Sequence, residues 1–380
     1  MTKLKKKVKL KMPAKIILGL FVTLFASVIL FFIGYMYLES NLKKLGYSEK
    51  ASEFILSNFK YQYVQDYPSN KTLNAAFESQ YYDENNLEHY SKIVYKNHSH
   101  LIKNINSLLK VGYTDREISM ILNHGDDKSV SDFSKRERIK YLEEFYTYSF
   151  ARLENYDRYI HYMNEYGDDE ETTIIKVNLN LDKEDYADYV EVNDYSNMVL
   201  ANKHYYLGEA YVPKNLIKVS SEYLKNSKNE VEGVNEAVGN AITMIKAAKA
   251  EGYDLRINSG YRSFSDQEEV YHTYLDLYGE NYVLNYVSRA GFSEHQTGYA
   301  FDFASGNSDV FAESEEYKWM IKNSYKYGFI YRFLKSKEEI TGVKHEAWHF
   351  RYVGKKAAKI IDEEELCFEE YYAKYLGRID

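Results

Sequence analysis

The chain has 380 residues, of which 45% are hydrophobic, and its formal net charge is −8. This length allows one sizeable folded core together with accessory segments. The acidic balance argues against a nucleic-acid partner, which needs a basic surface. The single cysteine, Cys367, excludes an intrachain disulfide.

The N-terminal part combines a basic segment with a long apolar run. Residues 1–15 contain seven lysines and no acid, and residues 16–38 carry neither charge nor proline. A helix rises 1.5 Å per residue, so this run is long enough to cross a hydrocarbon core of about 30 Å. The preceding lysines favour a cytoplasmic N-terminus. We therefore expect a single-pass transmembrane helix in the cell membrane, with everything after it extracytoplasmic. The alternative, a cleaved signal peptide, has a shorter apolar region of about 7–15 residues.

Residues 39–192 are predicted to form a mostly helical extracytoplasmic stem. Gly46-Tyr47-Ser48 and Gly112-Tyr113-Thr114 share one pattern, in which glycine ends a helix and the hydroxyl residue caps the next. Further along, a helix is predicted over residues 136–156 and a short strand over residues 177–181, where apolar and polar residues alternate. The sequence identifies no protein partner for this stem.

Residues 193–380 are predicted to form a folded domain of the α+β class, with a small antiparallel sheet. Helical and strand patterns both occur here, but they do not alternate strictly, which disfavours a doubly wound sheet. The predicted elements are strands over residues 198–203 and 254–259, a helix over residues 231–249 ended by Gly252, and a helix capped by Ser265 with Glu268 completing a capping box.

A further strand, over residues 297–304, carries a candidate metal ligand. Its aromatic residues recur at every second position and should enter a core. Asp302 then points the other way, between two alanines that leave room for an ion and a substrate. His295 precedes this strand by one turn.

A second candidate cluster lies between residues 345 and 353. Glu346 is expected in a tight turn and His349 at the start of a strand, with Trp348 and Phe350 facing the core. The adjacent His345, like Glu294 beside His295, is assigned no role.

Together the two clusters predict a catalytic zinc site. Catalytic zinc typically keeps three N or O ligands and a water, and His295, Asp302 and His349 supply such a set. Glu346 is the candidate base for that water, so the constellation predicts metal-assisted hydrolysis. Arg262, in a loop at a strand end, suits a substrate carboxylate or a developing oxyanion; a surface ion pair explains it equally well.

These residues resemble the D-alanyl-D-alanine carboxypeptidases of the VanY type, which are zinc peptidases of the bacterial cell wall. The likeness covers residues 196–354, with Ala290 and Ala347 at positions where the family has proline. The segments that carry it are Leu200-Ala201-Asn202-Lys203, Tyr211-Val212-Pro213-Lys214-Asn215-Leu216, Ser259-Gly260-Tyr261-Arg262-Ser263, Ser293-Glu294-His295-Gln296-Thr297-Gly298 and Glu346-Ala347-Trp348-His349-Phe350-Arg351-Tyr352-Val353-Gly354.

The resemblance implies a role for each candidate. His295, Asp302 and His349 would bind Zn²⁺, Glu346 would be the catalytic base, and Arg262 would bind substrate or stabilise the transition state. The residues implied to line the substrate pocket are Tyr261, Gln267 and Ser293.

The implied function is a membrane-anchored, zinc-dependent D,D-carboxypeptidase that removes the terminal D-alanine from peptidoglycan stem peptides. An L,D-carboxypeptidase that trims tetrapeptides, or an endopeptidase that cuts cross-bridges, stays open because the motifs do not fix the shape of the pocket. A non-catalytic wall-binding module is disfavoured, since the base and all three ligands are present.

Overall fold

The computed structural model describes residues 14–67 and 69–376. The chain divides into two compact units, Met1–Tyr146 and Thr147–Asp380. This division differs from the predicted border between residues 192 and 193. The reason is that the last two helices of the predicted stem pack with the second unit, where Ile175 and Leu179 join its C-terminal core. The predicted basic segment, residues 1–15, lies almost wholly outside the described residues.

The first unit begins with helix α1 (Ala14–Lys44), which contains the predicted apolar run. In the described part of the chain, its segment Ile16–Lys44 is the one helix long and apolar enough to cross a membrane. Its large apolar side chains between Ile16 and Ile33 are exposed. These properties fit a single-pass anchor and equally fit a signal sequence.

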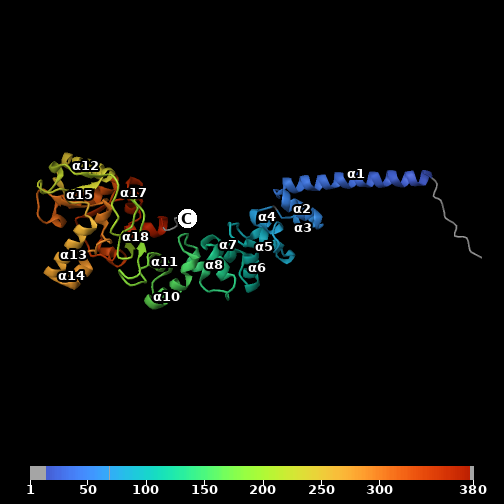
Figure 1. The fold of residues 1–380 in the computed structure, drawn as a ribbon, viewed down its shortest axis with the longest axis horizontal. Helices are drawn as coiled ribbons and strands as arrows, with labels where there is room; N and C mark the ends of the chain where they lie inside the picture. The colour runs from blue at the N-terminus through green and yellow to red at the C-terminus, as the bar shows by residue number, and fades with distance from the viewer. Residues whose placement is uncertain (1–13, 68, 377–380) are drawn as a thin grey trace, which may run out of the picture. The chain divides into compact units, whose positions relative to one another are not determined.

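Short helices make up the rest of the first unit, and both predicted cap signals are confirmed. Gly46 and Gly112 have φ of +92° and +101°, and Ser48 and Thr114 each accept a hydrogen bond from the backbone of the helix that follows. The helices are α2 (Glu49–Ser57), α3 (Tyr61–Val64), α4 (Lys71–Phe77), α5 (Leu87–Lys92), α6 (Leu101–Val111), α7 (Asp115–His124), α8 (Asp127–Phe133) and α9 (Leu142–Tyr146) (Figure 1).

Two predictions for the stem are wrong. The continuous helix over residues 136–156 is broken, because Tyr141 adopts a left-handed φ of +56° just before α9. The strand over residues 177–181 is absent: Asp169 caps a helix, α11 (Glu170–Asn178), that ends within this segment, and residues 179–181 form the turn after it. The helix cap at Asp169 therefore determines the local structure here, and the short apolar–polar alternation over residues 177–181 does not.

The second unit is α+β, as predicted, and is built on a four-stranded antiparallel sheet. The order of its strands is β5-β6-β8-β7. Two further pairs, β1 with β2 and β3 with β4, lie outside this sheet. The strands are β1 (Val190–Glu191), β2 (Tyr205–Tyr206), β3 (Leu216–Lys218), β4 (Glu232–Val234), β5 (Leu255–Ser259), β6 (Ala300–Ser305), β7 (Phe329–Tyr331) and β8 (His349–Tyr352).

One face of this sheet packs into the main hydrophobic core. Phe301, Phe303 and Phe350 are fully buried there, against α12 and α15. The predicted alternation of the strand over residues 297–304 is therefore confirmed, since the other face carries Asp302. The helices of this unit are α10 (Tyr156–Tyr166), α11 (Glu170–Asn178), α12 (Asn235–Ala250), α13 (Phe264–Tyr278), α14 (Glu280–Tyr286), α15 (Glu315–Asn323), α16 (Glu338–Thr341), α17 (Lys355–Glu363) and α18 (Phe368–Tyr371).

Three predicted elements of this unit need correction. Residues 198–203 form no strand, and the buried guanidinium of Arg351 donates hydrogen bonds to the carbonyls of Asn197 and Val199. The helix predicted from residue 231 begins at Asn235, since the preceding residues pair as β4. The cap of α13 is Ser263 rather than Ser265.

Two differences from the prediction, the cap residue of α13 and the position of the Trp348 side chain, have local causes. Ser263 and Asp266 form the capping box of α13, two residues before the predicted pair. Trp348 does not enter the core: 45% of it is exposed, because it lies in the turn before β8, whereas Phe350 lies within the strand.

Candidate metal centre

The sheet and a preceding 3₁₀ turn bring three buried ligand candidates together. Asp302 on β6 lies directly opposite His349 on β8, and His295 comes from the turn Glu294–Thr297. One ligand atom of each lies within 4.8 Å of the others. The distances to Asp302 Oδ1 are 3.5 Å from His295 Nε2 and 3.3 Å from His349 Nδ1.

Each imidazole is oriented by a hydrogen bond on its far side. His295 Nδ1 donates to the carbonyl of Gly260 at 2.7 Å, which turns Nε2 toward Asp302. His349 Nε2 lies 3.3 Å from Glu294 Oε2, which turns Nδ1 toward the same carboxylate. Such partners fix the tautomer of a metal-binding histidine and its ring orientation.

The donor set fits a divalent cation. Asp302 Oδ1 is buried and receives no hydrogen bond within the described chain, a costly state for an anionic oxygen. Two inward-facing imidazole nitrogens and this oxygen are the ligands that zinc takes in catalytic sites. Burial opposes ionisation of Asp302, but the imidazoles of His295 and His349 hold the pKa of its carboxyl well below its usual range.

The two histidines differ in their protonation. Burial lowers the pKa of His295. Burial acts in the same direction on His349, but the neighbouring carboxylates of Asp302 and Glu294 outweigh that effect and raise its pKa to about 9. Because a metal ligand must be a neutral imidazole, binding of a cation would release this proton.

A buried chain of charges supports His349 from behind. Glu294 accepts from Arg332 Nε at 2.8 Å and lies 3.3 Å from Arg351 Nη1. Arg332 in turn donates to both carboxylate oxygens of Glu369 on α18. Burial disfavours the charge of Glu294, yet the two guanidiniums keep the pKa of its carboxyl well below its usual range. Sequence reasoning gave Glu294 no role; its partners come from distant segments.

Glu346 lies beside the candidate ligands, in the turn before β8. Its Oε2 is 3.7 Å from His349 Nδ1. Burial disfavours its charged form and raises its pKa to about 7. A carboxyl group poised near neutral pH suits a group that accepts a proton and later returns it.

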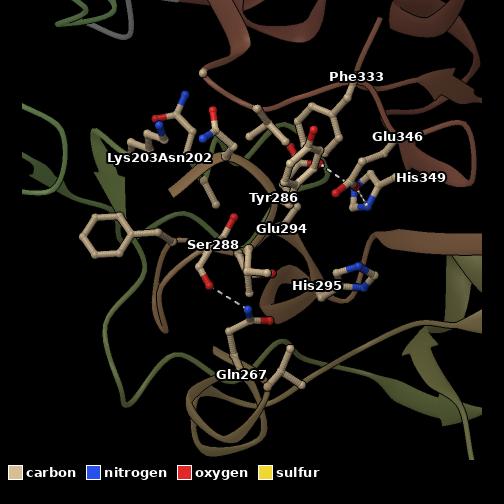
Figure 2. A pocket seen from close by; sticks show the side chains of 18 of the residues that line it. Asn202, Lys203, Gln267, Tyr286, Ser288, Glu294, His295, Phe333, Glu346 and His349 are labelled. Atoms are coloured by element: carbon tan, nitrogen blue, oxygen red, sulfur yellow. Dashed lines mark hydrogen bonds and ion pairs between the residues drawn. The ribbon is translucent and has the colours of Figure 1, made fainter. Parts of the chain in front are cut away.

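Most of the other predicted site residues line the same cavity (Figure 2). Arg262 Nη1 donates to Gln267 Oε1 at 2.7 Å, and Gln267 Nε2 donates to the carbonyl of Ser288 at 2.7 Å. Ser293 also lines the cavity. Tyr261 is placed differently: it does not belong to the described lining, and its backbone N–H pairs with the carbonyl of Glu232.

Several lining residues were not predicted from the sequence. They include a group of aromatic side chains on the wall formed by α13 and α14. Hydrophobic periodicity identifies buried helix faces, and these rings lie on the solvent-exposed side of the helix pair, so the sequence pattern did not reveal them. The unpredicted lining residues include Tyr186, Lys203, Tyr274, Tyr282, Tyr286, Phe333 and Trp348.

Comparison with known proteins yields one family and several relatives. Residues 232–355 match the family model VanY, described as D-alanyl-D-alanine carboxypeptidase. The YodJ protein of Bacillus subtilis (strain 168) is 40% identical over 183 residues, which are 47% of this chain and 67% of YodJ. A D-alanyl-D-alanine carboxypeptidase of Enterococcus faecium is 32% identical over 187 residues, 46% of this chain and 57% of that enzyme. The chain thus spans between about half and two thirds of these relatives.

Two solved structures are similar to parts of the chain. The LdcB LD-carboxypeptidase is 37% identical, with a TM-score of 0.46 and coverage of 50% of this chain and 92% of LdcB. VanYB in complex with D-alanine-D-alanine is 30% identical, with a TM-score of 0.42 and coverage of 47% and 98%.

Proposed function

Because the chain belongs to the VanY family of D-alanyl-D-alanine carboxypeptidases, we propose that it removes the terminal D-alanine from peptidoglycan stem peptides in a zinc-dependent reaction. The chain is a metallopeptidase of this family; the zinc ion and the peptidoglycan substrate are the proposed parts. The observation that carries them is the convergence of two oriented imidazole nitrogens on the buried Asp302 Oδ1, which accepts no hydrogen bond within the described residues, with Glu346 alongside.

His295, Asp302 and His349 would hold the zinc ion. When bound, zinc acts as a Lewis acid and lowers the pKa of a bound water toward about 7. Glu346 accepts a proton from the attacking water and later returns it to the departing amine of D-alanine. Its pKa of about 7 suits both transfers.

Arg262 is proposed to bind the terminal carboxylate of the substrate. Its hydrogen-bond partner in the described chain is the neutral amide of Gln267, which leaves its charge available to an anion. A guanidinium pairs with a carboxylate in a bidentate manner, which orients as well as binds it. Ser293 and Gln267 would form the adjacent polar wall of the pocket.

We further propose that α1 anchors the protein in the cell membrane, with the N-terminus cytoplasmic and the catalytic domain, residues 193–380, outside. The length and apolar character of α1 support an anchor, and the lysines before it support the orientation. Of the predicted stem, the part before the second compact unit, residues 39–146, would then space the catalytic domain from the bilayer.

The test is product analysis with the full-length protein in detergent micelles. Stem pentapeptide, stem tetrapeptide and cross-linked dimer substrates are incubated separately, with and without a chelator, and the released amino acids and peptides are identified by mass spectrometry. We expect D-alanine from the pentapeptide, loss of the reaction with chelator and recovery with zinc. Release from the tetrapeptide alone would assign an L,D-carboxypeptidase, and cleavage of cross-linked dimers alone an endopeptidase. Failure of zinc to restore activity would reject zinc dependence.

A further inference from the structure

Four tyrosines on α13 and α14 form an exposed aromatic surface at the edge of the candidate metal centre. This tyrosine face consists of Tyr274 and Tyr278 on α13 and Tyr282 and Tyr286 on α14. Tyr282 is central, with ring centroids 4.7 Å from Tyr278, 4.9 Å from Tyr286 and 5.9 Å from Tyr274. Tyr274, Tyr282 and Tyr286 also line the cavity that contains Glu346 and His349, and Tyr286 is seen among the lining side chains in Figure 2.

The tyrosine face is not part of a hydrophobic core. All residues of the two helices are described, and Gln267 in α13 and Val283 in α14 are the ones that are buried. Tyr274, Tyr278 and Tyr286 are 38%, 59% and 45% exposed. α13 and α14 pack chiefly on each other (Figure 1). A contiguous exposed aromatic surface beside a polar cavity is typical of a binding site.

We propose that the tyrosine face binds an N-acetylated sugar of the glycan strand to which the stem peptide is attached. This inference rests on the proposed function and adds a second part of the same substrate. A pyranose ring presents an apolar C–H face together with hydroxyl and amide groups. Tyrosine matches it, because its ring is apolar and its hydroxyl both donates and accepts hydrogen bonds.

The distances along α13 agree with the length of the substrate. Gln267 marks the cavity through its hydrogen bond to Arg262. At 1.5 Å per residue, Tyr274 and Tyr278 lie about 10 Å and about 17 Å farther along the helix axis. In a stem pentapeptide, four residues separate the scissile bond from the sugar and span at most about 14 Å when extended. A peptide that leaves the cavity along α13 therefore passes Tyr274 and ends about 3 Å short of Tyr278, so that the sugar ring attached to it extends onto the tyrosine face.

Charge favours a sugar over the other occupants of such a surface. Residues 264–286 contain five acidic residues and neither lysine nor arginine. An anionic lipid surface would be repelled, and a second copy of this acidic face would repel the first. The sugar carries no charge once its lactyl group is joined to the peptide as an amide.

The test compares two substrates of identical peptide sequence, a free pentapeptide and the same pentapeptide on its disaccharide, with full-length protein in detergent. We expect kcat/KM to be about three- to tenfold higher for the disaccharide substrate, as expected from one aromatic contact. Tyr278→Ala should remove this advantage through KM and leave the free-peptide value unchanged, because Tyr278 is outside the described cavity lining. Tyr278→Phe, which keeps the ring, should retain most of it.

The matched control is Tyr166→Ala. Tyr166 is also 59% exposed and packs on a neighbouring tyrosine, Tyr162, but lies on α10; its removal should leave both substrates unchanged. Equal turnover of the two substrates by the wild type would overturn the inference while leaving the proposed function intact. A change of oligomeric state in Tyr278→Ala, by sedimentation and without loss of the sugar preference, would also overturn it. Absence of D-alanine release from both substrates would instead reject the proposed function.

Discussion

The two walls of the cavity are built in opposite ways. The sheet wall carries buried ionisable groups, each held by a partner: Asp302 by imidazoles, His349 by Glu294, and Glu294 by Arg332. The helix wall carries the exposed, uncharged tyrosine face and has little packing beneath it. Burying charge is costly and demands compensation. The contrast indicates that the protein uses buried, partnered charges to fix the positions of the candidate catalytic groups. The helix wall, which we propose only binds substrate, is held by far fewer buried interactions.

The largest effect is expected from the base on the sheet wall. Glu346→Gln should lower kcat by about 10²–10⁴-fold, because the amide cannot accept the proton of the attacking water. Bound zinc, measured by elemental mass spectrometry, should be unchanged. His295→Ala is the contrasting variant: it removes a ligand and should lose zinc together with activity. A zinc-loaded Glu346→Gln protein with wild-type turnover would show that the proton goes elsewhere.

The charge chain behind His349 should set metal affinity. Glu294→Gln is expected to weaken zinc binding by about 10–100-fold, the usual cost of losing a partner that orients a ligand. Competition with a chromophoric chelator measures this without any assay of activity. Glu369→Gln is the matched control, since it also removes a carboxylate from Arg332 but does not contact His349. Equal loss of affinity in both variants would mean that Arg332, rather than Glu294, governs the site.

The unfavourable free energy of burying the charged Glu346 carboxylate should lower the stability of the metal-free protein. The pKa of Glu346 is 4.5 in its ordinary state and about 7 in the folded protein. Between these values the folded state binds more protons than the unfolded state, so stability falls as pH rises. With chelator present, Glu346→Gln should therefore gain on the order of 1–3 kcal/mol over wild type between pH 4.5 and pH 8. Denaturant unfolding at both pH values measures the difference; parallel pH profiles would contradict it.

Local patterns in the sequence predicted the strand and the candidate ligands of the sheet wall, but not the buried ion pairs behind them. The alternation around Asp302 predicted both the strand and its two faces, because the period of a strand is visible within a few residues. The Gly-Tyr-Ser and Gly-Tyr-Thr caps were predicted because a cap, too, is encoded within a few neighbouring residues. Arg332 is separated from Glu294 by 38 residues and from Glu369 by 37. Pairings over such separations are set by the tertiary fold, so single-residue patterns do not reveal them.

The errors of prediction concentrate where two local patterns compete. Ser263 and Ser265 each begin a Ser-x-x-acid pattern, and only the fold selects the first as the cap of α13. Trp348 and Phe350 have strand spacing, but the strand begins between them. The tyrosine face escaped notice because helical periodicity identifies buried stripes, whereas these rings are exposed.

The smallest effect is expected at the start of the helix wall. Because α13 buries one residue, Gln267, its stability depends on its cap more than on packing. Ser263→Ala removes the side chain that accepts from the backbone N–H of Asp266 and should cost about 1 kcal/mol. Hydrogen exchange should rise within residues 264–278, while zinc affinity stays within about twofold, since no candidate ligand lies on α13. The hydroxyl of Ser265 forms a hydrogen bond with that of Ser263 and does not accept from the helix backbone within the described residues, so Ser265→Ala should change neither quantity. Loss of zinc affinity in Ser263→Ala as large as in Glu294→Gln would mean that the two walls are held together rather than separately.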